Sequence, residues 1–99
     1  MVFVQLKKSQ IDGKKYTAIF YDDSREKIKT THFGATGYED YTKHGDDERK
    51  RLYLERHRVR ENFADYQSAG SLSKHILWNK STLTASYNDY LRKFKLKKY

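Results

Sequence analysis

The sequence predicts a single α+β domain of 99 residues, and three observations indicate this fold class. Apolar and polar side chains alternate with a period of two within residues 1–37, which is typical of β-strands. Residues 38–94 favour helical spacing instead, and a chain of this length suits one small domain. We therefore expect an N-terminal three-stranded antiparallel β-meander packed against a long charged helix and two C-terminal helices.

The β-rich part, residues 1–37, contains three predicted strands. Residues 2–6 alternate and form the first strand, and the Asp12–Gly13 pair that follows is a turn signal. Residues 15–21 carry apolar side chains on both faces, which favours a central strand. Residues 26–33 are rich in β-branched side chains and are the third predicted strand. Three such strands present an apolar face that helices must cover.

A charged central helix is predicted within residues 38–63, starting near Gly45 or Asp46 and running to Arg60. The segment holds seven acidic and seven basic side chains, so it carries no net charge. Its acids come first and its arginines follow, which is the order that the helix dipole favours. The charge of this segment is therefore ordered along the helix and not uniformly basic.

Residues 64–94 are predicted to form two short helices, followed by a basic tail at residues 95–99. The first helix has Ser71 as its N-cap, and Trp78 near its end is expected to anchor the core or a contact between helices. Ser81 is suited to cap the second helix, which has the cleanest amphipathic pattern in the chain. Its apolar stripe consists of Leu83, Tyr87, Tyr90, Leu91 and Phe94.

One stripe of the central helix carries arginines where an ordinary helix would carry apolar residues. At about 100° per residue, Arg49, Tyr53, Arg56 and Arg60 share this stripe, and His57 lies beside it. One interpretation is a solvated helix whose arginine stems cover neighbouring side chains. The other is an anion-binding face, in which the arginines hold phosphate or carboxylate and Tyr53 and His57 give the site its shape.

The net charge of +8 points to a polyanionic partner: nucleic acid, an acidic protein or, less readily, anionic lipid. Most of the surplus lies in residues 64–99, which have seven basic and two acidic side chains. Near the end, basic and aromatic residues alternate, a pattern that could follow a phosphate backbone or simply keep a tail soluble. The basic residues concerned are Arg92, Lys93, Lys95, Lys97 and Lys98.

The composition also excludes several classes of protein. The chain has no cysteine, which excludes a disulfide framework, a thiolate zinc site and a cysteine nucleophile. Fourteen tyrosine and phenylalanine side chains and one tryptophan indicate a folded protein. The apolar run at residues 1–4 is too short for the core of a signal peptide, and no segment approaches a membrane span. We therefore expect a protein that is neither secreted nor bound to a membrane and that needs no cofactor.

Four side chains are candidates for a metal site, namely Asp40, His44, Asp46 and Glu48. On one continuous helix, the spacing of Asp40, His44 and Glu48 would place them on one face, where they could hold a hard divalent ion as a nuclease does. Gly45 interrupts this set, and acids at the start of a helix commonly cap its amide groups instead. No catalytic residue is assigned, because no nucleophile or carboxylate is placed beside His57 by the sequence.

Four short motifs lie between residues 33 and 94. Their positions are Phe33 and Gly34; Asp40, Tyr41, Thr42 and His44; Arg49, Tyr53, Arg56 and His57; and Leu72, Ser73, Leu77, Trp78 and Asn79. This combination resembles a small family of uncharacterised proteins that are encoded by large double-stranded DNA viruses of algae and protists. The resemblance implies a viral origin and carries no catalytic role.

These observations favour a small, basic, non-enzymatic viral protein that binds DNA or RNA mainly through phosphate contacts. It would act in the cytoplasm or nucleus of the host cell, or within the virion. Two alternatives stay open. One is a virion or minor capsid protein that binds acidic protein partners, and the other is a metal-dependent nuclease centred on the four candidate residues.

Overall fold

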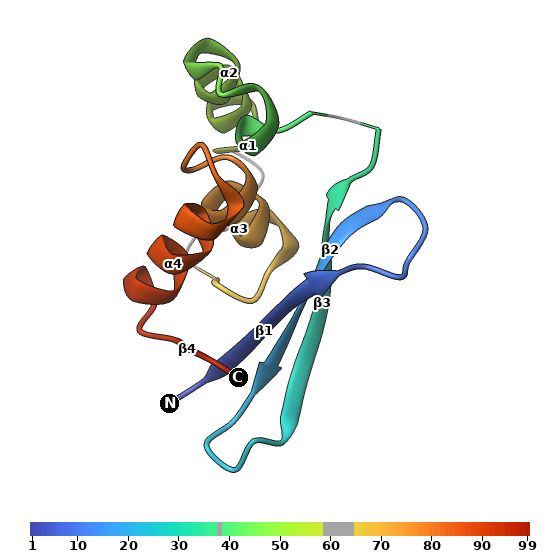
Figure 1. Ribbon diagram of the computed structural model, residues 1–99, viewed down its shortest axis with the longest axis vertical. Helices are drawn as coiled ribbons and strands as arrows, with labels where there is room; N and C mark the ends of the chain where they lie inside the picture. Colours follow the sequence, from blue (N-terminus) through green and yellow to red (C-terminus); the bar gives the residue numbers. More distant parts are fainter. Residues whose placement is uncertain (38, 59–64) are drawn as a thin grey trace.

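A computed structural model describes residues 1–37, 39–58 and 65–99, and it shows an α+β fold with a mixed four-stranded sheet (Figure 1). The first three strands come before the helices, and a short fourth strand follows them. The elements are β1 (Phe3–Lys8), β2 (Lys14–Tyr21), β3 (Lys27–Ala35), α1 (Tyr41–His44), α2 (Asp47–Arg58), α3 (Ala69–Leu72), the π-helical turn η1 (Ser73–Leu77), α4 (Leu83–Lys93) and β4 (Lys97–Lys98).

The strands lie in the order β3-β2-β1-β4. β1, β2 and β3 are consecutive antiparallel neighbours, which agrees with the predicted meander, and β2 is an interior strand. β4, which the sequence did not predict, pairs in parallel with the outer edge of β1. The register places Ala18 opposite both Leu6 and Thr31, so these three side chains share one face of the sheet.

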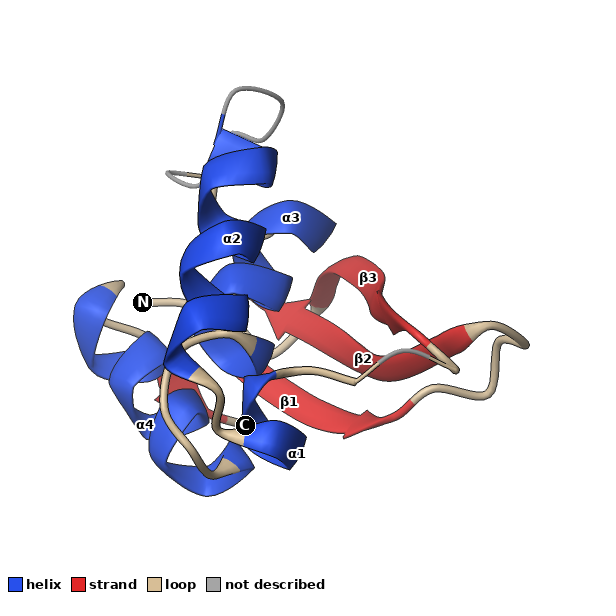
Figure 2. Cartoon of the chain, turned by 90° about the horizontal axis from the view of Figure 1, so that it is seen from above, coloured by secondary structure: helices blue, strands red, loops and turns tan. Residues whose placement is uncertain are grey.

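The core lies between one face of the sheet and the helices α3, η1 and α4, as Figure 2 shows from above. Alternate residues of the strands point into it because side chains along a strand alternate between its two faces. Tyr90 of α4 is fully buried in this core. The core side chains are Val4, Ala18, Phe20 and Phe33 from the sheet, and Leu72, Ile76, Leu77, Tyr90, Leu91 and Leu96 from the C-terminal half.

No described helix covers the opposite face of the sheet, where aromatic rings and an arginine stack on one another. The rings of Tyr21 and Tyr99 are stacked with their centroids 3.7 Å apart. The guanidinium of Arg25 lies 4.5 Å from the centroid of the Phe3 ring and 5.6 Å from that of Tyr99. This cluster shields part of the uncovered face from water.

A single long charged helix is not shown. Instead, α1 ends at Gly45, whose left-handed backbone (φ +60°) closes the helix as a C-cap. α2 then starts afresh, because the side chain of Asp46 accepts hydrogen bonds from the backbone N–H groups of Glu48 and Arg49. The end of the predicted helix, at residues 59–63, lies outside the described residues. No helix in the described ranges is long and apolar enough to cross a bilayer.

The C-terminal helices begin at other residues than predicted. Ser68, not Ser71, is the N-cap of α3, and Ser71 is buried in the helix that follows. α3 continues directly into the π-helical turn η1. Thr82, one residue after the predicted cap Ser81, accepts a hydrogen bond from the N–H of Ala85 and so caps α4.

Residues 95–99, expected as a basic tail, are built into the fold. Leu96 is buried in the core. The N–H groups of Lys97 and Tyr99 donate to the carbonyl oxygens of Val2 and Val4, at 3.2 and 2.9 Å. The backbone of this segment is thereby fixed along β1, and the side chains of Lys95, Lys97, Lys98 and Tyr99 extend into solvent.

Candidate anion-binding cleft

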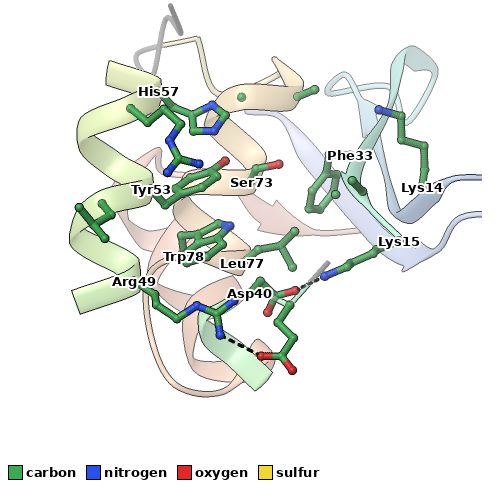
Figure 3. Close-up of a pocket in the computed structure, with 17 residues that line it drawn as sticks. Lys14, Lys15, Phe33, Asp40, Arg49, Tyr53, His57, Ser73, Leu77 and Trp78 are labelled. Atoms are coloured by element: carbon green, nitrogen blue, oxygen red, sulfur yellow. Dashed lines mark hydrogen bonds and ion pairs between the residues drawn. The ribbon is translucent and has the colours of Figure 1, made fainter. Parts of the chain in front are cut away.

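A cleft of about 680 Å³ lies between α2 on one side and strands β2 and β3 on the other, with η1 at its floor (Figure 3). Its lining combines four lysine and arginine side chains with two carboxylates and a set of apolar and small residues. The cationic residues are Lys14, Lys15, Arg49 and Arg56, the acids are Glu39 and Asp40, and the remainder are Phe33, Gly34, Ala35, Leu52, Tyr53, His57, Ala69, Gly70, Ser73, Leu77 and Trp78.

The wall formed by α2 contains three of the four members of the predicted stripe, Arg49, Tyr53 and Arg56, together with His57, which was predicted to lie beside it. Arg60 lies outside the described residues. Arg49 forms an ion pair with Glu39 at 3.1 Å, and both side chains are at least half exposed. Arg56 is exposed and makes no hydrogen bond or ion pair within the described residues. At least one guanidinium at the cleft is therefore not paired with a carboxylate of the described residues.

Stacked rings hold α2 against the end of η1. The rings of Tyr53 and Trp78 are almost parallel, with an interplanar angle of 5° and centroids 4.2 Å apart, and His57 stacks on Tyr53 at the same distance. Lys50 adds a hydrogen bond from its ammonium to the carbonyl oxygen of Asn79, at 2.7 Å. Trp78 thus joins two elements, and the edges of the rings, rather than their faces, line the cleft (Figure 3).

The π-helical turn determines which residues form the floor. The N–H of Trp78 donates to the carbonyl oxygen of Ser73 five residues earlier, at 3.1 Å. This wider turn brings Ser73, Leu77 and Trp78 to the cleft together. Such turns are rare in helices and are frequent at functional sites.

Gly34 lets β3 approach η1 closely. Its backbone is left-handed, with φ +80°, and a Cβ atom at this position would lie 2.8 Å from Cδ1 of Leu77 and 3.2 Å from Cβ of Lys15. Any other residue would therefore push into the floor or into the neighbouring strand. The width of the cleft on this side depends on a glycine.

A buried ion pair closes one end of the cleft. Nζ of Lys15 on β2 lies 2.6 Å from Oδ2 of Asp40, and these side chains are only 12% and 3% exposed. Asp40 also caps α1 by accepting hydrogen bonds from the backbone and side chain of Thr42. This carboxylate therefore fixes the start of the helical segment to the sheet.

The model of a family of unknown function, DUF5754, matches residues 4–57 of the chain. The chain belongs to the DUF5754 family. The match runs from β1 to His57, so the DUF5754 region includes the sheet wall and most of the α2 wall of the cleft, whereas Ser73, Leu77 and Trp78 follow it. Neither the curated proteins nor the solved structures compared with the chain give a match.

The four candidate metal ligands of this DUF5754 member have other roles. Nδ1 of His44 accepts a hydrogen bond from the N–H of Asp46 at 2.9 Å, so the ring proton of the neutral imidazole lies on Nε2. Asp40 pairs with Lys15, and Asp46 caps α2. Glu48 pairs with the Arg51 guanidinium, which lowers the pKa of this carboxyl. Within the described ranges, no three or more histidine and acidic side chains are grouped to hold a metal.

The predicted basic residues at the C-terminal end of the DUF5754 chain form a separate group. Arg92 pairs with Asp89 at 2.9 Å, and the ammonium of Lys98 lies 5.7 Å from the centroid of the Tyr87 ring. Burial, and then the charge of Lys93, lower the pKa of Lys74 nearby. None of these C-terminal cations lines the cleft, and Figure 1 shows β4 well apart from α2. The predicted set is therefore divided between two surfaces.

The sheet wall of the DUF5754 cleft was missed by sequence reasoning. Lys14, Lys15, Phe33 and Gly34 lie on β2 and β3, at or just beyond the ends of the predicted strands at residues 15–21 and 26–33, and none of them was predicted as a binding residue. The available signal was the positive charge at the start of β2, which periodicity along a single strand does not connect to α2.

Proposed function

We propose that this protein binds nucleic acid, DNA or RNA, through phosphate contacts and without catalysing a reaction. The observation that carries the proposal is the meeting of Lys14, Arg49 and Arg56 at one cleft, where Arg56 has no ion pair within the described residues. Guanidinium groups offer planar pairs of donors that match phosphate oxygens. Because Glu39 is exposed, phosphate can compete with it for Arg49 at little cost.

The positive surface continues beyond the cleft. A second cavity of about 450 Å³ lies next to it and shares Lys14, Lys15, Glu39 and Asp40 with it. Lys8 and Lys43 also line this second cavity. The C-terminal cations would add attraction that does not depend on sequence.

The biological setting is a proposal too. The resemblance described above supports an origin in a large DNA virus, with action inside the host cell or the virion. An acidic virion protein is the competing partner, because the same cations would bind carboxylates. Metal-dependent cleavage of nucleic acid has no structural support in the described residues, where the four candidate ligands are otherwise engaged.

Binding to fluorescent single-stranded and duplex DNA across a salt series tests the proposal. The affinity of the wild type should fall steeply as salt rises. In a plot of the logarithm of the binding constant against the logarithm of the salt concentration, each duplex phosphate that the protein neutralises should contribute about −0.9 to the slope. Arg56→Ala should weaken binding and reduce the slope by about one contact. Arg51→Ala is the matched control, because Arg51 lies on the same helix, pairs with Glu48 and Glu55, and does not line the cleft.

Two results would contradict the proposal. One is the absence of binding to either DNA form at low salt. The other is an equal loss of affinity in the Arg51→Ala and Arg56→Ala variants, which would show a general charge effect in place of a site. The first result would direct attention to an acidic protein partner, and pull-down with a polyglutamate resin would then be the next measurement.

A further inference from the structure

The cleft has the size of a site for a small molecule. Pockets that bind such ligands usually measure about 300 to 1,000 Å³, and this one measures about 680 Å³. A single phosphate group would leave most of that space empty. The backbone of an intact duplex would reach the rim but not the floor, since its bases are stacked inside the helix. The geometry therefore suits a ligand with a phosphate and a further, flat part.

The lining likewise has a cationic part, suited to a phosphate, and an apolar part, suited to a flat group. Lys14, Arg49 and Arg56 supply positive charge. The accessible apolar lining consists of the half-buried rings of Tyr53 and Trp78, together with small residues such as Ala69 and Gly70 that leave room beside them. Phe33 and Leu77 are buried beneath this lining. Aromatic side chains with accessible surface are suitable contacts for a nucleobase.

Two polar groups are placed where they could contact the edge of a base. Figure 3 shows the hydroxyl of Ser73 and the indole nitrogen of Trp78 directed into the cleft, on the side that faces Phe33. Neither group makes a side-chain hydrogen bond within the described part of the chain. The indole N–H can only donate, whereas the hydroxyl can donate and accept, so together they can satisfy the carbonyl and ring-nitrogen atoms of a base.

From this arrangement we propose that the cleft binds one unpaired nucleotide, with its phosphate at Arg56 and its base beside Ser73 and Trp78. The proposal rests on the function proposed above and makes it more specific: single strands should bind better than duplexes. A paired base would have to leave the stack before it could enter, whereas a base in a single strand is already accessible.

The only tryptophan of the chain lies in this cleft, so its fluorescence reports on the site directly. The protein is titrated with AMP and UMP, and separately with adenosine and with inorganic phosphate. We expect a saturable change of Trp78 emission with the nucleotides and a response at least about tenfold weaker with adenosine, because it lacks the charged contact. Inorganic phosphate should change the emission little, because it does not reach the floor.

Variants test which side chains are responsible. Arg56→Ala should weaken AMP binding by about tenfold or more, and Arg51→Ala should leave it unchanged. Ser73→Ala should weaken AMP binding severalfold while leaving the salt slope of oligonucleotide binding unchanged. Circular dichroism spectra that match the wild type are required of each variant, so that a loss of binding is not a loss of folding.

The outcomes separate this inference from the proposed function. If oligonucleotides bind with a salt slope but AMP and UMP leave the Trp78 emission unchanged, the nucleotide inference is wrong and phosphate binding stands. Equal affinity for a single strand and for a hairpin duplex of the same length would also overturn it. An inorganic phosphate response as strong as that to AMP would show a plain anion site. If neither nucleotides nor oligonucleotides bind, both proposals fail.

Discussion

Gly34 is the residue at which a single methyl group should matter most. Gly34→Ala must place a Cβ atom 2.8 Å from Leu77 and keep a left-handed backbone. We expect the free energy of unfolding, measured with urea, to fall by about 3 kcal/mol. Gly13→Ala is the control, because Gly13 has a similar φ of +89° but open space around it. The free energy of unfolding of Gly13→Ala should fall only by the cost of a left-handed backbone with a Cβ atom, about 1 kcal/mol. Equal losses in the two variants would show that the contact with Leu77 is unimportant.

Asp40 provides a second test at the residue scale. Asp40→Asn leaves the ammonium of Lys15 without its carboxylate in a site where both side chains are largely buried. The free energy of unfolding should fall by about 3 kcal/mol. In the double variant Lys15→Met/Asp40→Asn, most of this loss should be recovered, since no charge is then buried. Chemical denaturation of the wild type, Asp40→Asn, Lys15→Met and the double variant measures the coupling energy of the pair, and additive losses would contradict an interaction.

The sequence supported a metal site at Asp40, His44 and Glu48 only on the assumption of one continuous helix. Their spacing would place them on one face of such a helix. In the structure, Gly45 takes a left-handed conformation between them, and Nδ1 of His44 is used by the backbone. Spacing alone does not reveal a C-cap inside a charged segment, although the glycine itself was a visible warning.

At the scale of single elements, α4 should make the protein sensitive to alkaline pH. Burial raises the pKa of Tyr87 from 10 to about 12, and it raises that of Tyr90 as well. In the unfolded chain these phenols ionise near pH 10, so the stability they contribute is complete below pH 10. It is lost as the pH rises from 10 through about 12, because the unfolded state then releases protons that the folded state retains.

Denaturation at several alkaline pH values measures this effect. Tyr87→Phe should make the fall in the free energy of unfolding shallower, although at neutral pH it loses about 1 kcal/mol with the hydrogen bond to the carbonyl of Val4. Tyr99→Phe, on the uncovered face of the sheet, is the control and should leave the slope unchanged. If the free energy of unfolding of Tyr87→Phe falls with pH as steeply as that of the wild type, Tyr87 is not a source of the alkaline sensitivity.

The elements differ in how well the sequence predicted them. Alternation located β1 and β2 because strands impose a period of two on side chains, and the β-branched residues at 26–33 located β3. The amphipathic stripe located α4, although its cap is Thr82. β4 has only two residues, both lysine, and depends on pairing with β1, so no local pattern could reveal it. The π-helical turn of η1 likewise looks like an ordinary helical segment in sequence.

At the cleft, the sequence predicted the residues that share one helix but not those that come from other elements. Periodicity placed Arg49, Tyr53 and Arg56 on one face of a helix, and the structure has all three at the cleft. It could not tell which part of the chain this face would meet. Phe33 and Trp78 reach the site from other elements through tertiary packing, which single-element patterns do not encode.

At the scale of the whole molecule, residues 95–99 should be needed for stability. Truncation after Phe94 removes the buried Leu96 and the pairing of β4 with β1. We expect the free energy of unfolding to fall by about 2 kcal/mol or more, as for the removal of a buried leucine. A Lys97→Ala/Lys98→Ala variant keeps the strand and should retain nearly wild-type stability. A truncated protein as stable as the wild type would show that β4 adds nothing to the fold.

This result also decides how the C-terminal cations should be studied. Truncation would confuse a loss of folding with a loss of binding, whereas alanine substitutions at Lys97 and Lys98 remove charge and keep the backbone pairing. The two basic surfaces can then be compared as point variants within one folded molecule.

The parallel pairing of Phe3 with Lys97 also determines when the sheet is completed during synthesis. β1, β2 and β3 are neighbours in sequence, so they can pair soon after they leave the ribosome. The outer edge of β1 then keeps its backbone amide and carbonyl groups open until β4 has emerged. During translation of the residues between β3 and β4, a nascent sheet with an open edge is therefore exposed to other strands. Slow translation of this stretch should increase aggregation of the nascent chain.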